Sequence, residues 1–68
     1  MKYFVYILQS LKDKKYYIGC TSDLPKRLKY HSQGKNKSTR YRVPFVVVYS
    51  EEFKDKHLAY QREFFLKS

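Results

Sequence analysis

The fold is decided by two short tyrosine segments near the start of the chain, Val5-Tyr6-Ile7 and Tyr16-Tyr17-Ile18-Gly19. Each segment lies in a run of aromatic and β-branched residues, and a mostly polar stretch, 10–14, separates the two runs. This pattern is typical of a β-hairpin, and it predicts strands over 3–9 and 15–21.

The length of the hairpin loop determines which way Tyr6 and Tyr17 point. A loop with an even number of residues, such as 11–14, places both on one face, whereas an odd loop places them on opposite faces, because side chains alternate along a strand. We predict the even loop. Gly19 then leaves a gap beside the two phenols, which favours a face that a substrate can approach. The opposite face is apolar and requires a covering helix; it consists of Tyr3, Val5, Ile7, Tyr16, Ile18 and Cys20.

Start and stop signals predict a helix directly after the hairpin. Asp23 is a suitable N-cap, and Pro25 is tolerated in a first helical turn. The predicted helix therefore runs from Asp23 to residue 32 or 33, and Gly34 ends it.

The second half of the chain predicts one strand and one further helix. After a polar, basic loop at 35–43, Pro44 marks the start of a third strand over 45–49. Asp55 can cap a final helix that continues to residue 65 or 66. The predicted order of elements is ββαβα.

Positive charge dominates this chain of 68 residues, which has a formal net charge of +9 and is expected to form one domain over 1–68. Between residues 24 and 50 there is no Asp or Glu, and the cations are Lys26, Arg27, Lys29, Lys35, Lys37, Arg40 and Arg42. One-sided positive charge favours a polyanionic partner, because neutralised phosphates release counterions. The alternative is a merely soluble basic protein, such as one associated with the ribosome.

The single cysteine, Cys20, rules out an internal disulfide. The sequence shows no signal peptide and no long apolar run. These features predict a reducing, cytoplasmic setting and no membrane partner. One cysteine and two distant histidines, His31 and His57, make no zinc site.

Both predicted helices carry polar residues at the margin of an apolar stripe. On the first helix, Arg27 and His31 are four residues apart and therefore neighbours, and we expect both to lean toward the sheet edge. The stripe expected on the last helix is Leu58, Ala59, Phe65 and Leu66. Glu63 lies at its margin, as a partly buried metal ligand would, although most such glutamates are simply solvated.

In this order the motifs resemble those of the GIY-YIG nuclease superfamily, in particular its small stand-alone bacterial domain proteins. The matching elements are Tyr-Tyr-Ile-Gly at 16–19, Thr-Ser-Asp-Leu-Pro-Lys-Arg-Leu at 21–28 with His31 after it, and Arg62-Glu63. The resemblance covers essentially the whole chain. It extends to the nuclease half of the bacterial nucleotide-excision incision enzyme.

The resemblance implies an α+β sandwich in which helices flank a three-stranded antiparallel sheet. It also implies a DNA phosphodiesterase that depends on a divalent metal. The motif tyrosines are then Tyr6 and Tyr17, and Arg27 is the catalytic arginine. Glu63 is the ligand of one Mg²⁺ or Mn²⁺, and His31 matches an accessory histidine of some members. Two positions depart from the family pattern. Phe4 stands where the family has its first glycine, and Cys20 stands where a basic residue often follows the second motif.

Further residues are candidates for gripping a nucleic-acid backbone. The basic loop is expected to track phosphates and to offer Tyr41 for base stacking. The predicted contacts are Lys26, Lys35, Lys37, Thr39, Arg40 and Arg42. The plain alternatives are an ordinary flexible loop, core aromatics at Tyr6 and Tyr17, and a solvated Arg27. His31 is expected to be structural or a phosphate donor rather than a catalyst.

Three functions fit these residues. The leading one is a DNA nuclease that is structure-specific or acts in DNA repair, and its sequence preference should be low because nothing resembles a base-reading element. One well-placed carboxylate argues for one metal rather than two. A tyrosine of pKa ~10 needs neighbouring cations to act as a base, and the sequence leaves open which tyrosine activates water. The rivals are a catalytically weak module that binds DNA or RNA by charge and shape, and a domain that needs a partner subunit.

Overall fold

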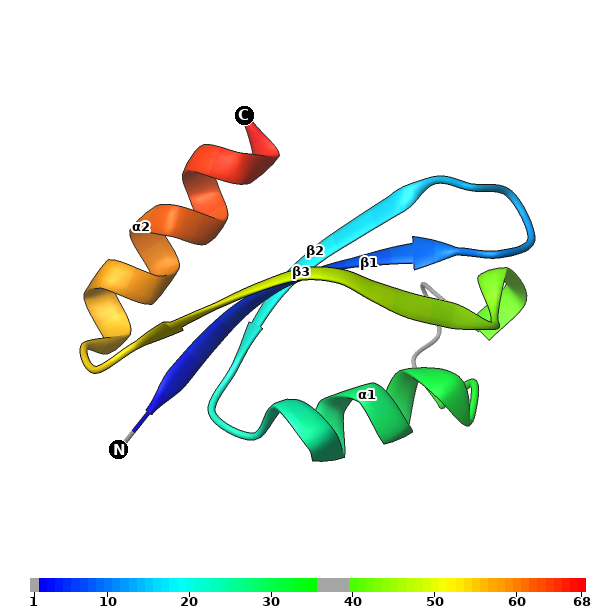
Figure 1. The fold of residues 1–68 in the computed structure, drawn as a ribbon, viewed down its shortest axis with the longest axis horizontal. Helices are drawn as coiled ribbons and strands as arrows, with labels where there is room; N and C mark the ends of the chain where they lie inside the picture. The colour runs from blue at the N-terminus through cyan, green and yellow to red at the C-terminus, as the bar shows by residue number, and fades with distance from the viewer. Residues whose placement is uncertain (1, 36–39) are drawn as a thin grey trace.

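The computed structural model describes residues 2–35 and 40–68, and it has the predicted order ββαβα (Figure 1). The strands form one antiparallel sheet in the order β2-β1-β3, so that β1 is central. The elements are β1 (Tyr3–Ser10), β2 (Tyr16–Thr21), α1 (Leu24–Ser32), the short 3₁₀ helix η1 (Arg40–Arg42), β3 (Phe45–Phe53) and α2 (Lys56–Lys67).

The hairpin has the even loop predicted from the sequence. The amide of Ser10 donates a hydrogen bond to the carbonyl of Lys15 at 2.9 Å, which leaves a four-residue loop between them. Tyr6 is paired with Gly19, two residues beyond Tyr17. Both tyrosines therefore lie on the same face of the sheet, as expected.

Aspartates begin both helices. The carboxylate of Asp23 accepts a hydrogen bond from the amide of Lys26 at 3.1 Å, and that of Asp55 accepts one from the amide of His57 at 2.7 Å. Such caps typically contribute about 1 kcal/mol each. Gly34 follows α1 with a positive φ of 70°, a conformation that glycine adopts without strain. These local signals are why the helix starts were predictable.

The two helices cover opposite faces of the sheet (Figure 1). The α1 helix covers the face of Tyr6 and Leu8, and α2 covers the apolar face that includes Val5. We expected the tyrosine face to be open to a substrate; this is wrong for Tyr6, which is only 2% exposed, whereas Tyr17 on the same face is partly exposed. The reason is His31, which projects from α1 and fills the space above the tyrosines.

The α2 helix is rotated differently from the prediction. Leu58 and Phe65, expected in the buried stripe, are 52% and 65% exposed, whereas Ala59 is fully buried as expected. Leu66, the fourth residue of the predicted stripe, is half-buried. The side of α2 toward the sheet contains Ala59 and Arg62, and the guanidinium Nε of Arg62 donates to the carboxylate of Glu51 at 2.6 Å.

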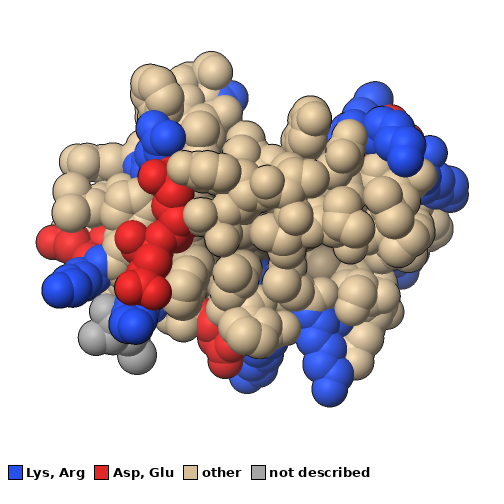
Figure 2. All heavy atoms as spheres, in the orientation of Figure 1, with Lys and Arg blue, Asp and Glu red and all other residues tan. Residues whose placement is uncertain are grey.

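Strand β3 extends to Phe53, beyond the predicted end at residue 49. Its polar residues continue the ladder because Glu51 and Glu52 pair with β1. As an edge strand, β3 also leaves a run of valines, 46–48, exposed. It crosses the face drawn in Figure 2, where uncharged side chains occupy the centre and the charged side chains lie toward the margins.

Candidate active site

The imidazole of His31 is the centre of the candidate site. It is 1% exposed, although it belongs to a residue type that is usually more accessible. Four aromatic rings surround it edge-on, with centroid distances of 5.0 Å to Tyr17, 6.1 Å to Tyr30 and Phe45, and 6.2 Å to Tyr6. This aromatic layer holds α1 against the sheet and fixes the orientation of the ring.

A buried hydrogen bond joins Tyr6 to His31. The phenol oxygen of Tyr6 lies 3.3 Å from Nε2 of His31. Burial raises the pKa of Tyr6 to about 12; Tyr17 adds to this shift, and the positive charge of Arg27 opposes it. Burial and then Arg27 lower the pKa of His31 below its ordinary value. Near pH 7 both groups are therefore neutral, and the tautomer of His31 decides whether the phenol or the imidazole Nε2 donates in this hydrogen bond.

Gly19 makes room for the phenol of Tyr6. A Cβ atom at this position would lie 2.4 Å from the phenol oxygen and 2.6 Å from Cζ of Tyr6. Because Gly19 is the ladder partner of Tyr6, the phenol lies flat across β2, the strand at the sheet edge. The glycine of the second motif is thus required by the close approach of the first motif's tyrosine.

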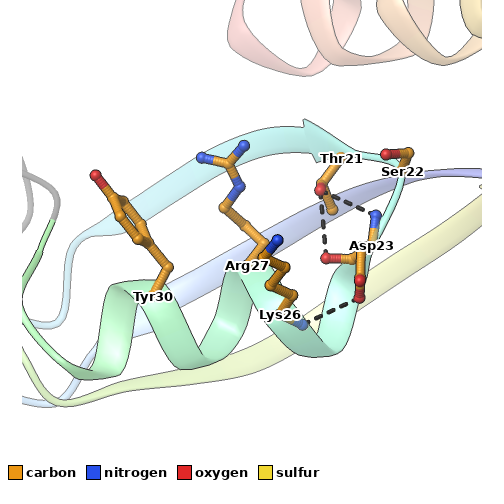
Figure 3. Close-up of a pocket in the computed structure, with 6 residues that line it drawn as sticks. All are labelled: Thr21, Ser22, Asp23, Lys26, Arg27 and Tyr30. Carbon is orange, nitrogen blue, oxygen red and sulfur yellow. Dashed lines mark hydrogen bonds between the residues drawn. The ribbon is translucent and has the colours of Figure 1, made fainter.

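Arg27 borders this buried pair from the solvent side. It lies one helical turn before His31 on α1, and its guanidinium carbon is 5.7 Å from the centre of the Tyr30 ring. Figure 3 shows both side chains rising from α1 toward the strands. They line a hollow of about 430 Å³, which we call the Tyr30 hollow; its lining residues are Thr21, Ser22, Asp23, Lys26, Arg27 and Tyr30.

Glu63, on α2, acts electrostatically on Tyr6 from the other face of the sheet. Its side chain is 21% exposed, and its charge raises the pKa of Tyr6, although less than burial does. It also raises the pKa of the Cys20 thiol, again after burial. A carboxylate oxygen of Glu63 lies 3.0 Å from Nζ of Lys67, one turn further along α2. The carboxylate is therefore within electrostatic range of the tyrosine site and is paired with a lysine.

The donor set suits a hard divalent cation held by one carboxylate. Within residues 2–35 and 40–68, no three His, Cys, Asp or Glu side chains gather into a ready-made metal site. Mg²⁺ typically keeps several waters and relies on one or two carboxylates and on substrate phosphates. Glu63 fits this role if Lys67 releases it when the cation binds. Among the described residues, Arg27 and Lys26 form no ion pair with Glu63.

The predicted backbone-gripping residues are only partly brought together. Lys26 lies beside Arg27 in the Tyr30 hollow, whereas Lys35 and Arg40 are exposed elsewhere. The guanidinium of Arg40 stacks on the ring of Tyr41 at 4.6 Å, and that ring is 69% exposed. Two other predicted contacts, Lys37 and Thr39, lie outside the described residues, as does the side chain of Arg42.

Three neighbours of the site were not anticipated: Tyr30, Lys56 and Tyr60. Tyr30 follows Arg27 by three residues on α1, a spacing that makes helical residues neighbours and could have revealed it. Lys56 and Tyr60 line a second hollow beside Arg27. Their position depends on how α2 packs, and no local sequence signal reports it.

Comparison with known proteins identifies the family. The model of the GIY-YIG catalytic domain matches residues 2–68. The chain therefore belongs to the GIY-YIG family, a family of nucleases whose members generally use a divalent metal. The family resemblance seen in the sequence motifs is confirmed.

Several bacterial relatives are similar along nearly all of this chain. The chain is 39% identical over 66 residues to the UPF0213 protein YazA of Bacillus subtilis. The aligned region covers 96% of this chain and 66% of that protein. It is 45% identical over 65 residues to the UPF0213 protein CPE1444 of Clostridium perfringens, covering 94% and 69% of the two chains. The chain thus spans about two thirds of the length of these relatives.

A solved structure supports the fold. The solution NMR structure of the UPF0213 protein BH0048 from Bacillus halodurans is 41% identical to this chain, with a TM-score of 0.60. The match covers 98% of this chain and 71% of that chain.

Neither α1 nor α2, the two α-helices of the described part of the chain, has the length and apolar character needed to cross a membrane.

Gly19→Ala is expected to lower the free energy of unfolding by about 1–3 kcal/mol, because the new methyl group displaces the phenol of Tyr6. Urea unfolding measures the change. The same substitution made in a Tyr6→Leu background should cost less, since the clashing atoms are gone. An equal cost in both backgrounds would show that the phenol does not require this glycine.

The pKa of His31 predicts the direction of acid destabilisation. In the unfolded chain His31 has its ordinary pKa of 6.5, so below pH 6.5 it binds a proton that the buried imidazole of the folded chain does not. The free energy of unfolding should therefore fall as the pH is lowered through 6.5. Urea unfolding from about pH 8 to about pH 5 should show a shallower pH dependence for His31→Phe. His57→Phe, at the exposed histidine, is the control. The explanation fails if the two variants have the same pH dependence.

Proposed function

We propose that this chain is the catalytic domain of an endonuclease that hydrolyses DNA phosphodiester bonds with the help of one divalent cation. The observation that carries the proposal is the neutral, hydrogen-bonded pair of Tyr6 and His31, with the charges of Arg27 and Glu63 both acting on the phenol. Hydrolysis of a phosphodiester needs a proton acceptor for water and positive charge at the phosphoryl group. This arrangement supplies the acceptor and one fixed cation.

Arg27 holds the scissile phosphate in this proposal. A guanidinium can donate two parallel hydrogen bonds to phosphate oxygens, and the ring of Tyr30 orients it. Lys26, in the same hollow, adds a second positive charge. These groups recognise the backbone rather than base edges, so low sequence preference is expected. When bound at Glu63, the divalent cation stabilises negative charge that develops on the phosphoryl oxygens.

Tyr6 and His31 move the proton of the attacking water. Ionising a phenol of pKa about 12 near pH 7 costs about 7 kcal/mol, which disfavours a free phenolate. A concerted transfer avoids this cost in the tautomer of His31 whose Nε2 is unprotonated: water gives its proton to the phenol oxygen of Tyr6 while the phenol proton passes to Nε2 of His31. The resulting hydroxide forms the new bond to phosphorus as the bond to the leaving oxygen breaks. The leaving oxygen departs with the bonding electron pair and takes a proton from solvent water, and His31 then returns its added proton to the solvent. Tyr17, on the same face, orients the phosphate.

A DNA-binding module with weak catalysis is the second candidate. Two observations favour it: Tyr6 is 2% exposed, and Glu63 is paired with Lys67. For catalysis, a substrate must approach the phenol at the β2 edge and the carboxylate must leave its lysine. Binding by charge and shape needs neither change and would also accept RNA.

The test is cleavage of labelled branched, nicked and single-stranded DNA in Mg²⁺ or Mn²⁺. Arg27→Ala and Glu63→Gln should each lower the rate by about 10²-fold or more, because each removes charge that acts at the phosphoryl group. Glu52→Gln, which removes an exposed carboxylate from β3, is the matched control and should cut normally. Cutting that survives Glu63→Gln would reject Glu63 as the metal ligand. Retained DNA binding without any cutting would favour the binding module.

A further inference from the structure

A second hollow lies on the other side of Arg27. Its volume is about 340 Å³, within the range of about 300–1,000 Å³ typical of small-molecule sites. We call it the Tyr60 hollow; its lining residues are Tyr3, Cys20, Thr21, Ser22, Arg27, Lys56 and Tyr60. Arg27, Thr21 and Ser22 also line the Tyr30 hollow, so the two hollows are adjacent and share the arginine.

The Tyr60 hollow is positively charged. Arg27 enters it from α1 and Lys56 from the first turn of α2, and no carboxylate is among its lining residues. Neither cation forms an ion pair with a carboxylate among the residues that the structure describes. The charge of Lys56 also lowers the pKa of Cys20, against the larger effects of burial and Glu63, so the ammonium lies close to the thiol. Two cations without an ion-pair partner favour an anion in this hollow, even with the carboxylate of Glu63 close enough to act on the same thiol.

Tyr60 adds an aromatic surface to this hollow. Its ring is 49% exposed, and Nζ of Lys56 lies over one face of the ring, 5.5 Å from the ring centroid. The two residues are four apart on α2 and are therefore stacked neighbours. A cation beside an exposed aromatic ring is the combination that binds one nucleotide of a single strand, with the phosphate on the cation and the base on the ring.

We propose that the Tyr60 hollow binds an unpaired nucleotide next to the scissile phosphate. Lys56 pairs with the phosphate of that nucleotide, and its base stacks on the face of the Tyr60 ring that Lys56 does not cover. Arg27 contacts both this phosphate and the scissile one. A paired base is already stacked in its duplex, so the subsite selects DNA with a single-stranded flap, gap or branch at the cleavage position. This inference rests on the proposed function and specifies the substrate class.

Equilibrium binding in EDTA tests the subsite without requiring cleavage. The probes are a fluorescein-labelled hairpin DNA with a single-stranded flap and the same hairpin without the flap. Tyr60→Leu should weaken binding to the flap DNA by about 5- to 100-fold and leave binding to the hairpin unchanged. Tyr60→Phe keeps the ring and should bind like wild type. Phe64→Leu, at a more exposed ring of the same helix, is the control and should have no effect.

Two further measurements separate the roles of the residues. Lys56→Gln should weaken binding to the flap DNA and reduce the salt dependence of that binding by about one phosphate contact. Lys54→Gln, at a lysine outside the hollow, should change both the affinity and its salt dependence less. A 2-aminopurine base at the first flap position should be quenched on binding to wild type but not to Tyr60→Leu. The proposal would be overturned if Tyr60→Leu lost the same amount of affinity for the hairpins with and without the flap, or if it bound the flap DNA as tightly as wild type.

The outcomes also distinguish this subsite from the nuclease itself. Flap binding that depends on Tyr60 in a protein that never cuts would support the subsite and reject the catalytic proposal. Cutting by Tyr60→Leu at the wild-type rate and with the wild-type preference for flap over duplex DNA would support the nuclease and reject the subsite. Circular dichroism confirms that each variant is folded, which the exposed position of Tyr60 leads us to expect.

Discussion

The contact between Tyr6 and His31 is the interaction on which the rest of the structure depends. It joins the central strand to α1 through two side chains that are almost completely buried. Gly19 is needed because the phenol lies against it, and the other aromatic rings are arranged around the imidazole. Removing either partner would leave a buried polar group without this hydrogen bond, which typically costs about 1–3 kcal/mol. Stability and the candidate chemistry therefore rest on the same pair.

The same contact explains why opposite charges can act on one site. Tyr6 extends over β2 at the edge of the sheet, so that Arg27 acts on it from the α1 side and Glu63 from the α2 side. The low exposure of the phenol strengthens both effects, because little water screens them. In this basic chain of net charge +9, a carboxylate and an arginine thus both act on the hydroxyl of Tyr6. This is why the proposed site for a metal and a phosphate lies there.

Local signals in the sequence predicted most of the fold. The order ββαβα, the even hairpin loop and the caps at Asp23 and Asp55 each depend on a few neighbouring residues. The burial of Tyr6 was missed because it depends on how closely α1 packs His31 against the sheet, and no local sequence signal determines that distance. The rotation of α2 was missed because it depends on contacts between different elements, among them the ion pair between Arg62 and Glu51. For the site, the residue types were recognised, but the neutral state of the pair and the Tyr60 hollow follow from burial and from α2 packing.

The most direct test of this account is the pH dependence of DNA cleavage by wild type and by His31→Gln at saturating metal. The account predicts that the wild-type rate rises with pH as His31 loses its proton, with an apparent pKa below the ordinary 6.5 of histidine. In His31→Gln this rise should disappear and the maximal rate should fall. A variant that keeps the same rising limb and the same rate would contradict the proton transfer from Tyr6 to His31.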